Sequence, residues 1–181
     1  MATSHLPPGC RLIYDNATII AALDELAAKL NRKLAHKDPI VLTVMQGGLI
    51  FAGHIIPRLK CMLEIDYIHV SRYNNETSGG DMTWKAYPAS VLKDRTVLIL
   101  DDILDEGHTL QSIIQYCESQ GAKEVLSAVL VKKNHKRCVE HEPLDRALTD
   151  NIALTVDDNY VFGFGMDYNG QYRQLDAIYK I

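Results

Sequence analysis

The amino-acid sequence predicts an α/β fold, a parallel-centred β-sheet flanked by helices. Two continuous apolar runs, at residues 96–100 and 125–131, have the pattern of strands that are buried on both faces. A segment with helical spacing of its apolar residues, 109–120, lies between them. Strands that alternate with helices in this way build parallel sheets, because a parallel partner is reached only through a crossover connection.

Each further element follows from local signals. The first half is expected to contain, in order, a helix over 19–34 capped by Tyr14-Asp15-Asn16, a strand over 39–45 that stops at Gly47-Gly48, a helix from Leu49 to Pro57, and a strand over 63–70. The second half is expected to contain a strand at 96–100, a loop at 101–108, a helix at 109–120 that ends before Gly121, a strand at 125–131, irregular chain at 132–151, and strands at 152–156 and 160–164.

Length and composition place limits on the architecture. A chain of 181 residues suits a single domain over 1–181, with a small hood formed by the chain ends and the hydrophilic segment 71–87, of which 73–81 reads as a loop or hairpin tip. The net charge of −4 disfavours a nucleic-acid surface. No apolar run approaches the about 20 residues that span a bilayer, so no membrane contact is expected. Four cysteines in no CxxC pair, without a signal-peptide pattern, indicate reduced thiols in the cytoplasm.

The segment with the clearest chemistry is 97–110, VLILDDILDEGHTL. Its apolar strand ends at two adjacent carboxylates, Asp101 and Asp102, and the carboxyl ends of parallel strands are where open α/β sheets bind ligands. Gly107 then permits a backbone conformation that is closed to other residues. Backbone N–H groups at the start of the next helix form an anion cradle, to which Thr109 adds a hydroxyl donor.

This loop therefore places two complementary chemistries side by side. Hydrogen-bond donors suit a phosphate, and carboxylates suit the vicinal hydroxyls of a ribose, so together they indicate a ribose 5-phosphate. Neither the nucleoside-triphosphate-binding pattern GxxxxGK[ST] nor the dinucleotide-binding pattern GxGxxG is present. The usual sequence signatures of ATP hydrolysis and of NAD chemistry are therefore missing. Two alternatives stay open: a solvated strand end with a simple helix cap, and a phospho-acceptor receiver domain, whose first acidic pair would lie near the N-terminus.

The segment 97–110 resembles the phosphoribosyl diphosphate signature of the type I phosphoribosyltransferases. VLVKKN at 129–134 and YVFGFGMDYNGQYRQL at 160–175 are similar to the hypoxanthine-guanine branch of that family, and the ordered correspondence covers roughly residues 40–178. The resemblance implies the family's fold and the transfer of a 5-phosphoribosyl group from phosphoribosyl diphosphate to hypoxanthine or guanine, which gives IMP or GMP plus pyrophosphate. It also implies Mg²⁺ as cofactor and a homodimer or homotetramer.

The resemblance further implies roles for individual residues. Asp105 is the catalytic acid/base beside the purine N7, and the ribose hydroxyls are bound by Asp101 and Asp102. The 5′-phosphate is held by Asp105, Glu106, Gly107, His108 and Thr109. The purine is held by Lys132 at its 6-oxo group, by the ring of Tyr160, and by Val161 and Asp167. Pyrophosphate is held by Gln46, Gly47 and Arg173, magnesium by Asp167 and Asp101, and a mobile loop begins at Ser71, Arg72 and Tyr73.

Several positions depart from the family's usual pattern. Asp101 stands where Glu is common, Gln46 where Lys is common, and Arg72 separates Ser71 from Tyr73, which many members have adjacent. The phosphate turn reads Glu106-Gly107-His108 in place of the common Thr-Gly-Lys. A carboxylate beside a phosphate is repulsive, so the Glu106 side chain is expected to point away and leave its N–H to the ligand.

Two other functions remain as alternatives. A phosphoribosyl-diphosphate-sensing regulator that binds nucleic acid would need a basic face, which the net charge of −4 disfavours. A sister transferase for uracil, adenine or xanthine is disfavoured by Lys132 and the segment around Asp167.

The residues His135, Cys138 and His141 match no standard zinc spacing, so solvated chain is expected there.

Overall fold

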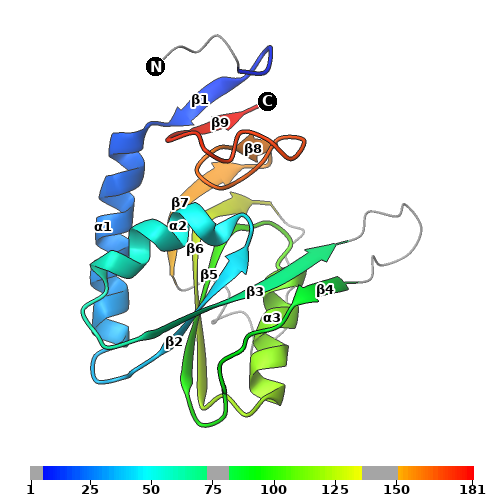
Figure 1. The fold of residues 1–181 in the computed structure, drawn as a ribbon. Coiled ribbons are helices and arrows are strands. Elements are labelled where there is room, and N and C mark those ends of the chain that lie inside the picture. The colour runs from blue at the N-terminus through cyan, green and yellow to red at the C-terminus, as the bar shows by residue number, and fades with distance from the viewer. Residues whose placement is uncertain (1–5, 73–81, 136–150) are drawn as a thin grey trace.

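The main element of the structure, a computed structural model that describes residues 6–72, 82–135 and 151–181, is a six-stranded sheet. Its strand order is β4-β3-β2-β5-β6-β7. The strands are β2 (Ile40–Met45), β3 (Glu64–Arg72), β4 (Met82–Ala86), β5 (Thr96–Leu104), β6 (Glu124–Asn134) and β7 (Ile152–Asp157). All neighbouring pairs are parallel except β3 and β4 (Figure 1). The predicted parallel-centred α/β fold is confirmed.

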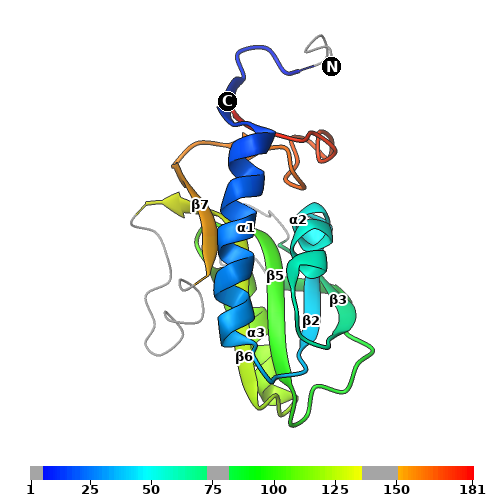
Figure 2. The ribbon, with the colours of Figure 1, turned by 90° about the vertical axis from the view of Figure 1, so that its left-hand side faces the viewer.

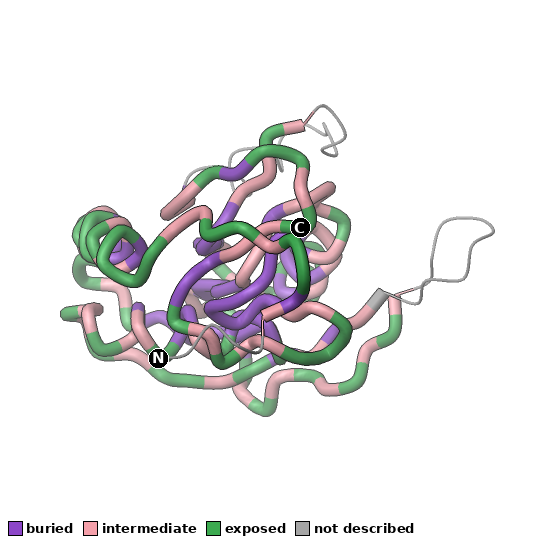
Figure 3. The backbone as a smooth tube through the Cα atoms, turned by 90° about the horizontal axis from the view of Figure 1, so that it is seen from above, coloured by how far each residue is buried: buried purple, intermediate pink, exposed green. Residues whose placement is uncertain are grey.

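Helices cover both faces of this sheet. α1 (Asn16–Lys33) and α2 (Gly48–Ile55) lie on one face, and α3 (His108–Ser119) lies on the other (Figure 2). A short 3₁₀ helix, Ile56–Arg58, continues α2 and contains the predicted terminator Pro57. Buried side chains from α1 and α2 form one apolar cluster with the sheet, and those from α3 form a second. The buried backbone accordingly lies in the middle of the molecule (Figure 3).

The first helix shows why the local prediction holds. Asp15 is its N-cap, and one side-chain oxygen accepts a hydrogen bond from the Thr18 backbone N–H at 2.9 Å. Apolar side chains at 3.6-residue spacing, among them Ile19, Leu23 and Leu30, are fully buried against the sheet. The predicted helix is confirmed and begins a turn earlier than its apolar pattern.

A second, three-stranded sheet joins the two ends of the chain. Its order is β1-β9-β8, with β1 at Arg11–Tyr14, β9 at Ile178–Lys180 and β8 at Val161–Phe162. It lies above the carboxyl ends of the large sheet's strands (Figure 1). The Tyr14 hydroxyl donates to the Thr155 carbonyl at 2.6 Å and so connects this sheet to β7. The sequence analysis predicted no strand at β1, β4 or β9, which are four, five and three residues long.

Two strands extend further than predicted. β5 continues to Leu104, so Asp101 and Asp102 lie within the strand and not in the expected loop at 101–108. The parallel ladder to β6 supplies the reason, since Asp101 pairs with Val129 and Leu104 with Lys132. β6 likewise continues to Asn134 through its ladder with β7, whereas irregular chain was expected from residue 132. Backbone pairing therefore overrides the polar character of these segments.

The strand expected at 160–164 is shorter than predicted. Only Val161–Phe162 pairs with β9, because Gly163, Phe164 and Gly165 all have positive φ angles, which no strand accommodates. The expected loop at 73–81 and most of the stretch 132–151 lie outside the described residues. No helix among the described residues has the length and apolar content that a membrane crossing requires.

Phe51 packs α2 against the sheet, and its truncation tests how much this packing contributes to stability. Its side chain is 0% exposed in the cluster shared with α1. Phe51→Ala should lower the free energy of unfolding by about 3–5 kcal/mol, because truncation removes buried area and leaves a cavity. Urea denaturation measures the loss. Met62→Ala, at a side chain that is 78% exposed, should stay within about 0.5 kcal/mol, and an equal loss there would contradict this account of the core.

Candidate active site

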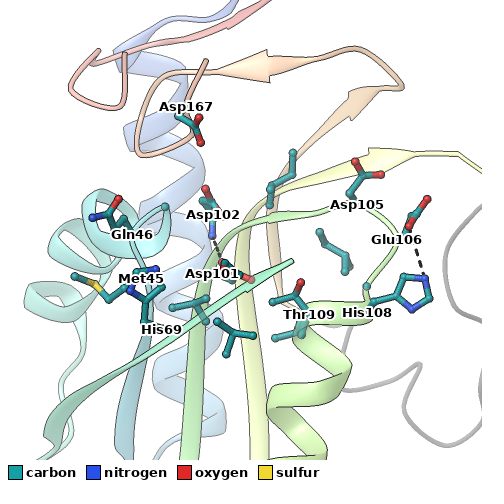
Figure 4. A pocket seen from close by; sticks show the side chains of 18 of the residues that line it. Met45, Gln46, His69, Asp101, Asp102, Asp105, Glu106, His108, Thr109 and Asp167 are labelled. Atoms are coloured by element: carbon teal, nitrogen blue, oxygen red, sulfur yellow. Dashed lines mark hydrogen bonds and ion pairs between the residues drawn. The ribbon is translucent and has the colours of Figure 1, made fainter. Parts of the chain in front are cut away.

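A hollow of about 400 Å³ opens at the carboxyl ends of β2, β3 and β5. Its lining includes most of the residues that the sequence pattern singled out, from Gln46 to Arg173 (Figure 4). The strand ends bring them together as the topology of a parallel sheet requires. Its described acidic side chains are Asp101, Asp102, Asp105, Glu106 and Asp167. Lys85 and Arg173 are the only lysine and arginine among the lining residues that the structure describes.

The two carboxylates at the end of β5 occupy different environments. Asp101 is 7% exposed, and one of its oxygens accepts a hydrogen bond from the Asp102 backbone N–H at 3.0 Å. Burial, followed by the neighbouring Asp102 charge, raises the pKa of Asp101 well above its ordinary value. Burial also raises the pKa of Asp102, although the Arg173 guanidinium opposes it. The pair therefore favours a bound cation or hydroxyl donors over two unpartnered negative charges.

The turn after β5 has the predicted form of an anion cradle. Gly107 is the N-cap residue of α3 with φ at 90°, a left-handed conformation that an L side chain rarely adopts. The backbone beyond it enters α3 at His108, and Thr109 also lines the hollow. The Glu106 carboxylate lies 3.6 Å from His108 Nε2 and extends away from Asp101 and Asp102 (Figure 4). The N–H groups at the start of α3 thus remain to receive an anion.

The loop after β2 packs directly against Asp102. Its Met45–Gln46 peptide bond is cis, in the loop for which the resemblance implied pyrophosphate binding. A Cβ added to Gly47 would lie 1.8 Å from Asp102 Oδ2, so a side chain here would require the Asp102 carboxylate to shift. A Cβ on Gly165, whose φ is 105°, would lie 2.1 Å from the Gly47 carbonyl oxygen. These two loops therefore pack backbone against backbone beside the carboxylate.

Arg173 and Asp167 form the rim of the hollow. Arg173 donates to the Gly165 carbonyl at 2.6 Å and forms an ion pair with Asp167 Oδ1 at 2.7 Å. The other Asp167 oxygen accepts from the Gly170 backbone N–H at 2.8 Å. Both residues reach the hollow from the segment that follows β8. Both side chains line the hollow, so the Arg173 guanidinium can meet an anionic ligand and the Asp167 carboxylate a cationic one.

A second hollow, of about 180 Å³, adjoins the first and shares Asp102, Asp105 and Asp167 with it. Tyr160 and Val161 line it, as expected for residues near a flat ring. The Tyr160 side chain is 51% exposed, and its hydroxyl donates to the Asp167 carbonyl at 3.0 Å. An exposed aromatic face beside hydrogen-bonding groups suits a planar heterocycle.

Lys133, and not the expected Lys132, lines this second hollow. Successive side chains on a strand point to opposite faces, so only one of two adjacent lysines can face the ligand. The Lys133 ammonium donates to Asp105 Oδ2 at 2.6 Å. The contact of Lys132 with the purine 6-oxo group stays a prediction beside this placement of Lys133.

Asp105 lies between two basic groups. Besides the Lys133 contact, His135 Nε2 lies 2.6 Å from Asp105 Oδ1, and the His135 side chain is 6% exposed. Burial raises the pKa of Asp105, but the hydrogen bonds from Lys133 and His135 outweigh it and hold the pKa below its ordinary value. Solvated chain was expected at His135, and that expectation was wrong.

The remaining residues of the site come from β3 and β4. Ser71 lines the first hollow, Arg72 ends β3, and Tyr73 lies outside the described residues. His69 and Lys85 also line the hollow and were not predicted. Burial, and then the Lys85 charge, lowers the pKa of His69. The signal for His69 was its place near the carboxyl end of a predicted parallel strand, opposite Met45 in the β2–β3 ladder.

Comparisons with known proteins agree with this geometry. A family model described as the phosphoribosyl transferase domain matches residues 11–169. The hypoxanthine-guanine phosphoribosyltransferase of Lactococcus lactis subsp. lactis (strain IL1403) is 32% identical over 93% of this chain and 88% of its own length. The hypoxanthine-guanine-xanthine phosphoribosyltransferase of Tritrichomonas foetus is 27% identical over 93% of this chain and 89% of its own.

The fold comparison leads to the same family. The crystal structure of a hypoxanthine phosphoribosyltransferase from Staphylococcus aureus is similar with a TM-score of 0.85 at 26% identity, and the match covers 94% of this chain and 90% of that one. Sequence motifs, strand order and site geometry all point in one direction. The chain belongs to the phosphoribosyltransferase family, in its hypoxanthine-guanine branch.

Proposed function

We propose that this chain is a purine salvage enzyme that transfers the 5-phosphoribosyl group of phosphoribosyl diphosphate to hypoxanthine or guanine, with IMP or GMP and pyrophosphate as products. The observation that carries the proposal is the pair of adjoining hollows. One is lined by the anion cradle and the β5 carboxylates, the other by Tyr160 and Lys133. They share Asp102 and Asp105, so a ribose 5-phosphate and a flat base would meet at these residues.

The chain's residues divide the reaction between them. The turn at 105–109 binds the 5′-phosphate, and Asp101 and Asp102 orient the ribose through its hydroxyls. The C1′–N9 bond then forms as the C1′–O bond breaks, and pyrophosphate leaves with the electron pair. Carboxylates near C1′ favour the positive charge that develops on the sugar. Asp105 accepts the N7 proton of the purine, a role worth about 10²–10⁴-fold in rate.

The donor set of the first hollow fits Mg²⁺. Its described lining has more carboxylates than cationic side chains, so a pyrophosphate group would be repelled without a further cation. Asp101 and Asp167 would hold the ion, because carboxylate oxygens are the ligands that Mg²⁺ prefers. When bound, Mg²⁺ neutralises charge on the pyrophosphate leaving group. Arg173 and the Gln46–Gly47 backbone would bind the same pyrophosphate group.

Closure of the site belongs to the same proposal. The segment 71–87, beginning at Ser71, would close over the two hollows and exclude water, which otherwise hydrolyses the activated sugar. We also propose a homodimer or homotetramer in the cytoplasm. The scattered thiols of Cys10, Cys61 and Cys117, which form no disulfide among the described residues, agree with a reducing compartment.

A panel of bases tests the function. With phosphoribosyl diphosphate and magnesium, the chain should convert hypoxanthine and guanine, whereas adenine should react at least about 10⁴-fold less efficiently because its 6-amino group offers a donor to the Lys133 donor. A continuous ultraviolet assay measures each rate. Xanthine belongs in the panel because the Tritrichomonas foetus relative carries it in its name. Efficient use of adenine, or of no 6-oxopurine, would exclude the proposal.

Lys133 is proposed as the residue that recognises the 6-oxo group. Its ammonium has three donors, so it can bond Asp105 and the base together. A charge-assisted hydrogen bond of about 1.5–3 kcal/mol corresponds to about 10- to 100-fold in kcat/KM. Lys133→Ala should therefore lower kcat/KM for guanine and hypoxanthine by that factor, and Lys132→Ala, its neighbour on β6, should have little effect. The reverse order of the two variants would show that the motif-based assignment to Lys132 is correct.

Gly47 sets how closely the pyrophosphate loop can approach Asp102. Gly47→Ala would force apart the loop and the carboxylate, whose oxygen would lie 1.8 Å from the new Cβ. A displacement near 1 Å in a reacting site costs about 10²-fold, so steady-state turnover should fall by roughly that factor. Gly53→Ala is the matched control on α2, because nothing lies within 4 Å of its added Cβ. Turnover of Gly47→Ala equal to that of the control would mean that this contact is unimportant.

A further inference from the structure

We propose that His135 is a positioning residue for the reaction, and that its imidazole holds the Asp105 carboxylate in the orientation that receives the purine N7 proton. The inference rests on the proposed function, which gives Asp105 its task. His135 directly follows β6, on a segment whose sequence indicated solvated chain. The inference adds to the proposed function a role for His135, a side chain that contacts the general base Asp105 and not the purine.

The geometry gives each Asp105 oxygen its own donor. His135 Nε2 lies 2.6 Å from Oδ1, and Lys133 Nζ lies 2.6 Å from Oδ2. The side chains of His135 and Lys133 are 6% and 13% exposed, whereas that of Asp105 is 41% exposed. Both donors are therefore covered by protein, while the Asp105 carboxylate between them lines the second hollow, where the purine is proposed to bind. Donors arranged in this way fix the side-chain rotation of a carboxylate.

The proton in the His135 contact can be assigned. An ionised carboxylate only accepts hydrogen bonds. Burial raises the pKa of Asp105, but the two hydrogen bonds outweigh that effect and keep the pKa below its ordinary value, so the carboxylate is ionised at neutral pH. His135 Nε2 must then carry the shared proton, whether the ring is neutral or charged.

The two donors differ in what else they face. Lys133 lines the base hollow and, in the proposed function, shares its ammonium with the purine 6-oxo group. His135 is not among the residues that line that hollow, so it acts on the reaction through Asp105. A carboxylate has about four lone-pair sites, so each Asp105 oxygen can accept more than the one hydrogen bond that His135 or Lys133 donates. His135 thus fixes Asp105 without occupying the position that the substrate needs.

A third element completes the surroundings of the imidazole. One ligand atom of Asp158, from the turn after β7, lies within 4.8 Å of one ligand atom each of His135 and Asp105. Among the described residues, the charged groups near this pair include Lys133 on β6 and Asp158 after β7, and Asp102 and Asp167 line the second hollow together with Asp105.

The test uses the full chain and three variants. His135→Ala removes the donor, His135→Gln keeps an N–H group at a similar reach, and Asn134→Ala changes the exposed neighbour on β6. We expect His135→Ala to lower kcat about 10- to 100-fold and to leave KM for phosphoribosyl diphosphate within about twofold, as for removal of an outer partner of a reacting group. His135→Gln should recover most of the loss, and Asn134→Ala should match the unmodified chain. Thermal unfolding of each variant checks that the fold is retained.

A second measurement does not depend on turnover. Carbon-13 NMR of the Asp105 carboxyl, assigned with Asp105→Asn, should show its pKa rising in His135→Ala and returning toward the starting value in His135→Gln. An unchanged titration of Asp105, or a kcat loss that His135→Gln does not recover, would overturn the inference. If the unmodified chain converts no base, the proposed function fails on its own, and the NMR titration still decides whether His135 holds Asp105.

Discussion

Two carboxylates near the carboxyl end of a buried parallel strand are the constraint around which this site is organised. Moving a charge from water into a protein costs free energy unless partners compensate it. The raised pKa of Asp101 records that cost directly. The chain offsets it with the Arg173 charge, with the Asp102 backbone N–H, and with a ligand site that attracts hydroxyls and cations. The close approach of Gly47 and Gly165 follows from the same crowding, because only backbone fits beside Asp102.

Much of the fold was accessible from the sequence, and for stated reasons. α1 carries its own cap, Asp15, and a buried stripe, so this helix can be located without knowledge of the rest. The apolar runs of β5 and β6 identify themselves in the same way. Their polar continuations do not, since Asp101 and Asp102 remain in the strand only because β6 offers them a backbone ladder. Pairing between distant segments is invisible to any local pattern.

The site shows the same division. The phosphate turn was predictable because its signals, a buried strand end followed by Gly107 and a helix start, are contiguous in the sequence. Lys133 and His135 were missed because their importance depends on register and on burial, and both are properties of the assembled sheet. A shift of one residue on a strand exchanges the two faces, so a family motif alone does not show which of Lys132 and Lys133 lines the second hollow.

The second sheet has a consequence for the order in which the molecule is made. The Tyr160 carbonyl accepts a hydrogen bond from the Ile181 backbone N–H at 3.1 Å, and β8 pairs only with β9. During synthesis β1 emerges first and must wait for residues 178–180 before it finds its partner strand. The large sheet can assemble earlier from the strands that precede them. The wall that carries Tyr160 therefore forms after those strands, so the newly made chain can form the turn at 105–109 before the Tyr160 side of the second hollow.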